Sequence, residues 1–505
     1  MFLGIFLVIV VIFYFKRGQQ NKERPNLILI SIDCLGSNHA SSYGYYRETT
    51  PSMDNFAKEG ILFKNYISQS YFTPTSEMSV HTGMYPSSNG VLGFDTVLSK
   101  NILTLSEILK IYNYRNAAFG NSPEFALFPL KENFNRGFDV YDFVDYTSPI
   151  NQENIFSFLA EKKEIPFFLW LGIGSNHLPY GKSSQKFGDL NYEGPLKGKK
   201  LDWWKGGVIH WIYSNILYSP DIKNKISLNE KDIQYIIDRY DSDVLSTDEW
   251  LGNFLKQLKK TGLDKNTIII IQSEHGEAFG EKGYIAHYDI FDNIIKTPLL
   301  IKLPSLNKKG LIIDNQTQGI DLLPTILDLL DIPKAHQIEG NSLVPLINGQ
   351  ASDNFNEYIF IERPLKSVII SSSDNDIAKK RQIILQSIII KGQLVEDYIK
   401  SLGIEFFLIN LKDTAIRTND WKLIYRKSKN YEEKYSWWVK MSGLEKKMAD
   451  YELYDLKTDP GEKENVIDRY PDVANELRTK LDFFIKKQEN KGIIPQIKKT
   501  VQGYF

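Results

Sequence analysis

The 505-residue sequence predicts an α/β domain with a central, mostly parallel sheet flanked by helices, followed by a smaller C-terminal α+β domain. Short β-branched runs alternate with helix-like stretches over residues 26–349, whereas hairpin-like strands dominate within 350–505. With 42% hydrophobic and 24% charged residues, the chain is neither disordered nor fibrous.

Residues 26–32 form a short β-branched run typical of a buried parallel strand, and it ends at Asp33. Similar runs are found at residues 167–173, 267–271 and 298–301, and helix-like stretches lie between them at 105–112, 240–260 and 321–330. Ligands of such sheets gather at the carboxyl ends of the strands. The polar residues just past these runs are therefore the candidates for function.

Residues 181–232, which include Trp203, Trp204 and Trp211, are predicted to be a long insertion that shapes a substrate-binding surface. In the C-terminal domain we expect a hairpin from residues 415–418 and 421–425, a strand at 451–456, a turn at 458–462 and an amphipathic helix at 472–487.

The charge balance and the cysteine count exclude several classes of protein. Lys plus Arg total 61 against 62 Asp plus Glu, which argues against a general nucleic-acid binder. Cys34 is the only cysteine of the chain, so an intrachain disulfide and a cysteine-rich zinc site are both excluded.

The first seventeen residues are predicted to be a hydrophobic anchor or signal, and 18–25 a polar linker. The apolar run ends at Lys16 and Arg17 and is shorter than the roughly 20 residues of a full membrane span. An uncleaved membrane anchor is favoured over a cleaved signal or a buried core segment. The basic residues that follow the run favour a cytoplasmic location for the main domain by the positive-inside rule.

Asp33, Glu274 and His275 are candidate metal ligands because they follow predicted strands, and two carboxylates with an imidazole suit a divalent cation. The structural alternatives are a capping or turn role for Asp33, and a solvated glutamate beside a packed histidine.

Thr73 is followed by Pro74, a pattern typical of a helix N-cap with proline at the first helical position. A hydroxyl there would lie in positive potential, which favours an alkoxide and an anionic ester. His177 and His287 also fall near predicted strand ends, where each could bind an anionic oxygen or protonate a leaving group, or simply pack.

After residue 25 the sequence resembles the sulfatase family of the alkaline-phosphatase-like superfamily. The resemblance rests on an ordered set of segments: residues 26–33, 42–45, 49–54, 59–63, 73–86, 136–139, 177–180, 273–277, 321–325, 340–343 and 452–465. It implies a large α/β domain with a central mixed sheet and a smaller C-terminal α+β domain.

The resemblance also implies a role for each candidate. Asp33, Thr73, Glu274 and His275 would hold one divalent metal ion, and Thr73 would attack the ester in line as a metal-bound hydroxyl. The substrate-contacting histidines of the family match His177 and His287. Lys296 matches a basic substrate-binding position and could equally be a solvated surface residue. Asn121, in Gly120-Asn121-Ser122, stands where the Lys-Trp-His motif of the family is missing and is taken as substrate-binding.

Several positions depart from the family pattern. The nucleophile of typical sulfatases is a Cys or Ser that becomes formylglycine within a Cys/Ser-x-Pro-x-Arg motif. Here Thr73, Thr75 and Glu77 occupy the three motif positions, and threonine cannot become formylglycine because its β-carbon carries a methyl group. Cys34 replaces the second acidic residue of the strand-end pair, and Glu274 replaces the usual aspartate.

These departures resemble the threonine branch of the superfamily, which includes phosphoethanolamine and phosphoglycerol transferases. We expect a metal-dependent hydrolase of sulfate or phosphate esters, with Mn or Zn favoured and Ca or Mg possible. The alternatives are a transferase acting on a glycan or lipid, and a catalytically inactive binder of anionic glycans. The expected partners are a sulfated or phosphorylated small molecule, glycan or lipid, and a membrane through the N-terminal segment. The resemblance implies an extracytoplasmic location.

Overall fold

The structure is a computed structural model. It describes residues 24–93, 96–126, 130–145, 150–161, 164–199, 201, 228–281, 285–287, 289–306, 308–350, 355–363, 366–371, 404–409, 413–426 and 450–490. The predicted anchor and the three tryptophans of the predicted insertion lie outside these residues. None of the described helices is long and apolar enough to cross a membrane.

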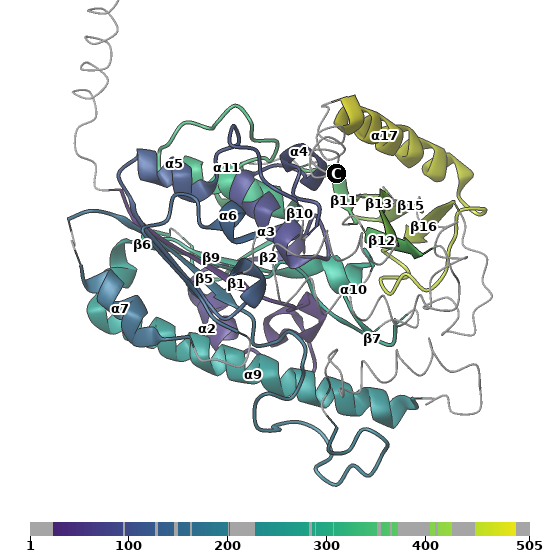
Figure 1. Cartoon of the computed structure of the whole chain (residues 1–505), viewed down its shortest axis with the longest axis horizontal. Helices are drawn as coiled ribbons and strands as arrows, with labels where there is room; N and C mark the ends of the chain where they lie inside the picture. The colour runs from purple at the N-terminus through teal and green to yellow at the C-terminus, as the bar shows by residue number, and fades with distance from the viewer. Residues whose placement is uncertain are drawn as a thin grey trace, which may run out of the picture.

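A central sheet of eight strands, in the order β10-β2-β9-β6-β1-β5-β3-β4, organises the main part of the chain (Figure 1). The strands are β1 (Asn26–Ile32), β2 (Ile61–Ile67), β3 (Arg115–Gly120), β4 (Val140–Phe143), β5 (Phe167–Ile173), β6 (Thr267–Gln272), β9 (Lys296–Lys302) and β10 (Leu311–Gln318). All neighbours are parallel except β9, which is antiparallel to both β2 and β6. A mostly parallel sheet is thus confirmed.

The prediction of a parallel strand at residues 298–301 is wrong in direction, because these residues lie in the antiparallel strand β9. Leu299, Leu300 and Ile301 are fully buried. A continuous apolar run reports burial on both faces of a sheet, and that burial is the same for either strand direction.

Helices cover both faces of the sheet (Figure 1). On one face lie α2 (Pro51–Glu59), α7 (Gln152–Ala160) and α9 (Glu230–Thr261), and on the other α3 (Thr73–Thr82), α5 (Leu105–Ile111), α6 (Leu130–Phe134) and α11 (Leu322–Leu329). Successive residues of β1 alternate between the two cores: Leu27 and Leu29 pack on the α3 side, and Ile28 and Ile30 on the α9 side.

The predicted helices are present with shifted bounds. Helix α9 begins at Glu230, ten residues before the predicted start and inside the predicted insertion. Asn229 caps it, and a capping box with Asp232 satisfies the first backbone N–H groups. The apolar face of α9 already includes Ile233 and Ile236, so the hydrophobic pattern extends before residue 240 and the predicted start was placed too late.

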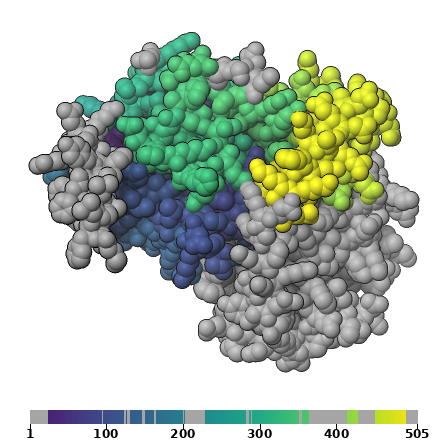
Figure 2. Space-filling view, turned by 90° about the horizontal axis from the view of Figure 1, so that it is seen from above, coloured from purple at the N-terminus to yellow at the C-terminus, as the bar shows by residue number. Residues whose placement is uncertain are grey.

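The C-terminal region contains a four-stranded antiparallel sheet of β11 (Ile359–Glu362), β14 (Thr414–Arg417), β15 (Trp421–Tyr425) and β16 (Tyr451–Asp455). The hairpin of β14 and β15 confirms the predicted pairing. Helix α17 (Pro471–Asn490) packs on this sheet through Leu477 and Leu481. The strands β12 (Lys366–Ser371) and β13 (Ile404–Ile409) form a separate pair. In Figure 2 the C-terminal segment, in yellow, lies directly against the main part of the chain.

Buried ion pairs join the C-terminal sheet to the segment that leads from β8 (Ile285–Ala286) into α10 (Asp292–Ile295). Asp292 Oδ2 lies 2.8 Å from Arg417 Nη2, and Asp292 Oδ1 lies 3.1 Å from Lys422 Nζ. Asp289 Oδ1 lies 2.7 Å from Arg426 Nη1. The pair of Asp289 with Arg426 holds the chain two residues after His287, and the two pairs of Asp292 hold it three residues further on.

Three further short elements of the described residues border the main sheet or the loops around it. They are α4 (Pro86–Asn89), α12 (Val344–Ile347) and β7 (Ala278–Phe279), which pairs with β8.

Candidate active site

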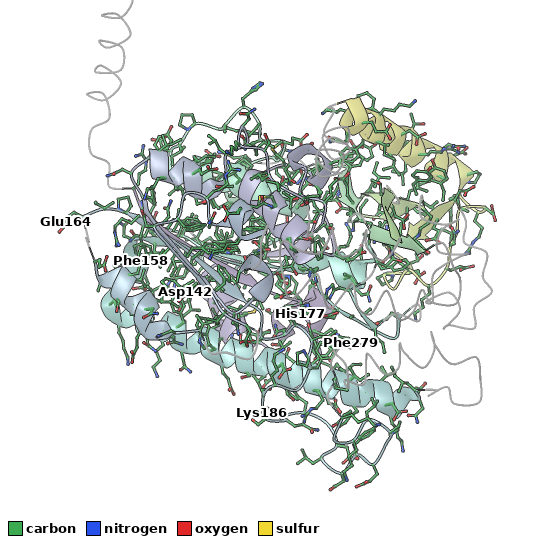
Figure 3. The ribbon with its side chains drawn as sticks, in the orientation of Figure 1. Asp142, Phe158, Glu164, His177, Lys186 and Phe279 are labelled. Atoms are coloured by element: carbon green, nitrogen blue, oxygen red, sulfur yellow. The ribbon has the colours of Figure 1, made fainter. Side chains whose placement is uncertain are left out.

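Candidate side chains meet at the carboxyl ends of β1, β5 and β6. Because β1 is parallel to both neighbours, the residues that follow the three strands emerge at the same edge of the sheet. These residues are Asp33, His177, Glu274 and His275. Figure 3 shows His177 at this end of the sheet and Glu164, which precedes β5, at the opposite end. The predicted strand-end cluster is therefore present.

Thr73 is the first residue of α3, and its hydroxyl points into the cluster. Its Oγ1 lies 2.9 Å from His275 Nε2 and donates a 3.5 Å hydrogen bond to Asp33 Oδ1. The prediction of Thr73 as N-cap is wrong, because Phe72 occupies that position. Thr73 is the first helical residue and Pro74 the second. Within the described residues, the Thr73 hydroxyl makes no capping hydrogen bond and contacts His275 in the loop after β6.

The loop after β6 is held tightly against the loop after β1. Ser273 Oγ accepts a hydrogen bond from Leu35 N (3.1 Å) and donates one to the carbonyl of His275 (2.9 Å). A Cβ at Gly276 would lie 2.7 Å from the Cα of Gly36, so only glycine permits this close backbone approach. This packing brings Glu274 and His275 next to Asp33.

The tautomer of His275 follows from its contacts. Its Nδ1 lies 3.2 Å from the carbonyl oxygen of Gly276, which can only accept, so Nδ1 carries the hydrogen. Its Nε2 lone pair then faces Thr73. Burial lowers the pKa of His275 to about 3, so the imidazole is neutral at physiological pH. A neutral Nε2 can accept a proton from the hydroxyl or bind a cation.

The two carboxylates of the cluster, Asp33 and Glu274, are buried together, and each residue is 2% exposed. Burial opposes ionisation of Asp33, but His177, a hydrogen bond with Glu274 and, to a lesser extent, His275 outweigh it, and the pKa of Asp33 falls to about 2. Burial and the adjacent Asp33 raise the pKa of Glu274 well above its ordinary value. Asp33 Oδ2 and Glu274 Oε2 have no hydrogen-bond partner among the described residues.

A divalent cation fits this arrangement. Ligand atoms of Asp33, Glu274 and His275 lie within 4.8 Å of one another, and two buried oxygens lack partners. A cation would satisfy these oxygens and offset the repulsion between the carboxylates. The described residues include two further groups of three that could hold a metal, one of Asp33, Cys34 and His177 and one of Cys34, His275 and His287.

His177 and His287 lie together beside the cluster, with ring centroids 5.3 Å apart. His177 Nδ1 lies 2.9 Å from the carbonyl of Leu178, so it carries the hydrogen, and burial lowers the pKa of His177. His287 Nδ1 lies 3.1 Å from Glu277 Oε1. Burial opposes protonation of His287, but Glu277 outweighs it and raises the pKa of His287. His287 is the better proton donor of the two.

Asn121 and Lys296 lie in different surroundings. Asn121 Oδ1 accepts a 2.8 Å hydrogen bond from Gly174 N, and its Nδ2 donates to Ser175 Oγ (3.2 Å), so it supports the loop that carries His177. Burial lowers the pKa of Lys296, and the charged groups that act on it are Asp292, Arg417 and Lys64. None of these three belongs to the cluster, and the substrate-binding role of Lys296 stays a prediction.

Three side chains of this region were not assigned a role from the sequence. Glu277 is fully buried and orients His287. Cys34 has a positive φ of 60°, and its Sγ lies 3.1 Å from Asp33 Oδ1 and 3.8 Å from His287 Nδ1. Glu77 accepts a 2.6 Å hydrogen bond from Gln272 beneath the site, and burial raises the pKa of Glu77 to about 7. In the sequence, the only indication that Glu277 belongs to the site is its position in the segment Ser273-Glu274-His275-Gly276-Glu277.

Curated relatives of the chain are sulfatases, which are sulfuric ester hydrolases. An ulvan-active sulfatase of Formosa agariphila is 25% identical over 361 residues, which are 65% of this chain and 66% of that protein. An N-acetylglucosamine-6-O-sulfatase of Bacteroides thetaiotaomicron is 24% identical over 406 residues, 66% of this chain and 72% of that protein.

Solved structures share the fold. A protein in complex with its substrate D-glucosamine-2-N,6-O-disulfate gives a TM-score of 0.66 at 19% identity, covering 93% of this chain and 99% of that one. A phosphonate monoester hydrolase of Agrobacterium radiobacter gives 0.64 at 18% identity, covering 92% and 96%. The family described as Sulfatase matches residues 25–332. Because this match spans more than half of the chain, the protein belongs to the sulfatase family of the alkaline-phosphatase-like superfamily.

Proposed function

We propose that this protein hydrolyses sulfate or phosphate esters by in-line attack of the Thr73 hydroxyl, in a site that holds one divalent cation. The observation that carries the proposal is the position of Thr73 Oγ1, 2.9 Å from His275 Nε2 and 3.5 Å from Asp33 Oδ1 at the start of α3. A hydroxyl placed between a neutral imidazole and a carboxylate has acceptors for its proton. Membership of the sulfatase family supports the same reaction class.

Asp33, Thr73, Glu274 and His275 would hold the cation. When bound, a divalent cation lowers the pKa of a coordinated hydroxyl and offsets the charge of the transferred group. Oxygen ligands with one imidazole suit manganese or zinc better than calcium or magnesium. The buried oxygens of Asp33 and Glu274 that lack partners support this assignment.

The chain supplies the remaining parts of the reaction. The N-terminus of α3 presents positive potential to the anionic ester. The Thr73 proton passes to Asp33 Oδ1, since His275 Nε2 would be a ligand of the cation. A bond forms from Oγ1 to phosphorus or sulfur, and the bond to the ester oxygen breaks. His287, whose pKa Glu277 raises against the opposing effect of burial, gives its proton to the departing oxygen. Water then hydrolyses the threonine ester and restores Thr73.

The residue at position 73 bears on the substrate. Threonine cannot form the formylglycine of typical sulfatases, and its sulfate ester is harder to return to free enzyme, so the chemistry favours phosphorus. The names of the relatives favour sulfated glycans. The proposal therefore covers both esters, with a glycan as the carrier of the anionic group.

A metal-reconstitution assay on the full-length protein tests the proposal. After chelation, hydrolysis of aryl sulfate, aryl phosphate and aryl phosphodiester is followed with Mn²⁺, Zn²⁺, Ca²⁺ or Mg²⁺ restored. We expect metal-dependent turnover that falls by at least about 10³-fold in Thr73→Ala, as when the nucleophile of a covalent mechanism is removed.

Thr82→Ala is the matched control. Thr82 ends the same helix and is buried; its Oγ1 donates to the carbonyl of Met78 and accepts a 3.4 Å hydrogen bond from Asn89 Nδ2, away from the cluster. We expect Thr82→Ala to keep its turnover. Equal loss in both variants, or turnover retained in Thr73→Ala, would contradict the assigned nucleophile. A metal-loaded protein that turns over none of the three esters would contradict hydrolysis.

A further inference from the structure

We propose that Cys34, His275 and His287 form a second cation site, selective for thiophilic divalent ions such as zinc, which overlaps the carboxylate site at His275. One ligand atom from each of the three residues lies within 4.8 Å of the other two. An ion in this second site would withdraw His275 and His287 from their proposed roles. The site therefore makes zinc an inhibitor, although zinc also suits the carboxylate set, and leaves catalysis to manganese, the other ion that suits that set.

The geometry matches zinc coordination. Cys34 Sγ lies 3.8 Å from His287 Nδ1. Two ligands of a tetrahedral zinc, at about 2.3 Å for sulfur and about 2.05 Å for nitrogen, lie about 3.6 Å apart. The rings of His275 and His287 are also adjacent, with centroids 4.4 Å apart. The positive φ of Cys34 belongs to the strained turn that directs its side chain toward these rings.

The two ligand sets differ in chemical character. Asp33 and Glu274 contribute oxygens with His275, whereas Cys34 contributes sulfur with two imidazoles. Two carboxylates with one imidazole suit manganese as well as zinc, whereas a thiolate with two imidazoles suits zinc over manganese. Since His275 belongs to both sets, an ion on one set removes a ligand from the other. The choice of metal therefore decides which set is filled.

The electrostatics also favour a cation here. Within the described part of the chain, no ion pair joins Asp33, Glu274 or Glu277 to a lysine or arginine; Asp33 and Glu277 pair only with histidines. Zinc binding would remove two protons to solvent. The Cys34 S–H bond would break as an S–Zn bond forms, and His287 Nδ1 would give up the hydrogen that it directs at Glu277 Oε1 as an N–Zn bond forms. Burial and the adjacent carboxylates raise the pKa of Cys34 and so hold its proton, and the ionised Asp33 and Glu277 attract the ion that would replace it.

The inhibitory consequence rests on the proposed function, because it assumes that His287 donates a proton to the leaving group. The binding itself does not depend on that function and is measured without substrate.

Cobalt titration of the metal-free, full-length protein tests the site, because a thiolate bound to Co²⁺ gives a charge-transfer band in the near ultraviolet. Cys34 is the only cysteine, so any such band reports on Cys34 alone. We expect a band that saturates at one equivalent and is displaced by zinc. It should be lost in Cys34→Ser, weakened in His287→Ala and retained in Glu274→Gln, which removes a ligand of the carboxylate set only.

His336→Ala is the control for histidine loss, because His336 is exposed and outside both sets. It should leave the band unchanged. Circular dichroism and thermal unfolding of each variant show that a lost band does not reflect unfolding. Absence of the band in the wild-type protein, or its persistence at full strength in both His287→Ala and His275→Ala, would overturn the proposed site.

The two proposals can fail separately. A band without esterase activity under any metal supports the second site and contradicts the proposed function. Manganese-dependent activity without a band, and without inhibition by zinc, contradicts the second site and leaves the proposed function standing.

Discussion

Replacement of Arg426 by methionine is expected to destabilise the junction between the two sheets. Arg426 is 3% exposed, and its guanidinium lies 2.7 Å from Asp289, 2.8 Å from Glu452 and 3.5 Å from Asp413. Methionine fills much of the same space but carries no charge. The variant leaves Asp289 and Glu452 without the cation paired with them, whereas Asp413 keeps Arg363 at 2.9 Å. Asp289 lies only two residues beyond His287.

The size of the effect follows from this burial. Removing one partner of a buried ion pair costs about 3–5 kcal/mol, because the remaining charge stays out of water. At about 2.1 cal/mol/K of unfolding entropy per residue, cooperative unfolding of 505 residues corresponds to about 1 kcal/mol per kelvin. We therefore expect the Tm of Arg426→Met to fall by about 3–5 °C, by the same arithmetic.

Scanning calorimetry measures this difference against an exposed pair. Arg469 pairs with Glu464 at 2.5 Å, and their side chains are 56% and 69% exposed. Arg469→Met should change stability by no more than about 0.5 kcal/mol, since solvent already screens that pair. If Arg426→Met lowers Tm no more than Arg469→Met does, the reasoning from burial is refuted.

Two further predictions concern Asp292 and Asn121. Burial opposes ionisation of Asp292, but Arg417 and other nearby basic groups outweigh it and hold its pKa below the ordinary value, so its stabilising effect is present above about pH 5 and lost as pH falls below about 4. The Tm gap between wild type and Asp292→Asn, followed by calorimetry from pH 7 to pH 3, should therefore narrow in acid, and a constant gap would contradict the assigned pairing. Asn121→Ala removes the acceptor for the buried Gly174 N–H and should cost about 1–3 kcal/mol, and it should lower kcat by loosening the loop that carries His177. An unchanged Tm and kcat would show that Asn121 does not support this loop.

Much of the fold could be predicted from the sequence because buried strands and amphipathic helices leave strong patterns. The apolar runs at β1, β5 and β6 mark strands that are buried on both faces. The direction of β9 could not be predicted, because pairing partners and not composition decide it. The start of α9 was placed too late although Ile233 and Ile236 extend its apolar face; Asn229 and its capping box mark the true beginning.

The part of the candidate site whose residues directly follow strands could be predicted from the sequence. Asp33, His177, Glu274 and His275 meet because parallel strands end at the same edge. The sequence separation between Glu277 and His287 gave no sign that they touch, since a hairpin of β7 and β8 brings them together. The approach of Cys34 to the histidines likewise depends on tertiary packing and a positive φ.

The central claim, that Thr73 attacks the ester, is tested most directly by rapid quenching and peptide mass spectrometry. The manganese-loaded protein is mixed with an aryl phosphate or aryl sulfate ester and quenched within the first turnover. We expect the transferred group on Thr73 of the wild-type protein and no modified peptide in Thr73→Ala. Steady turnover with Thr73 unmodified at every quench time would contradict the claim, because water would then attack the ester directly.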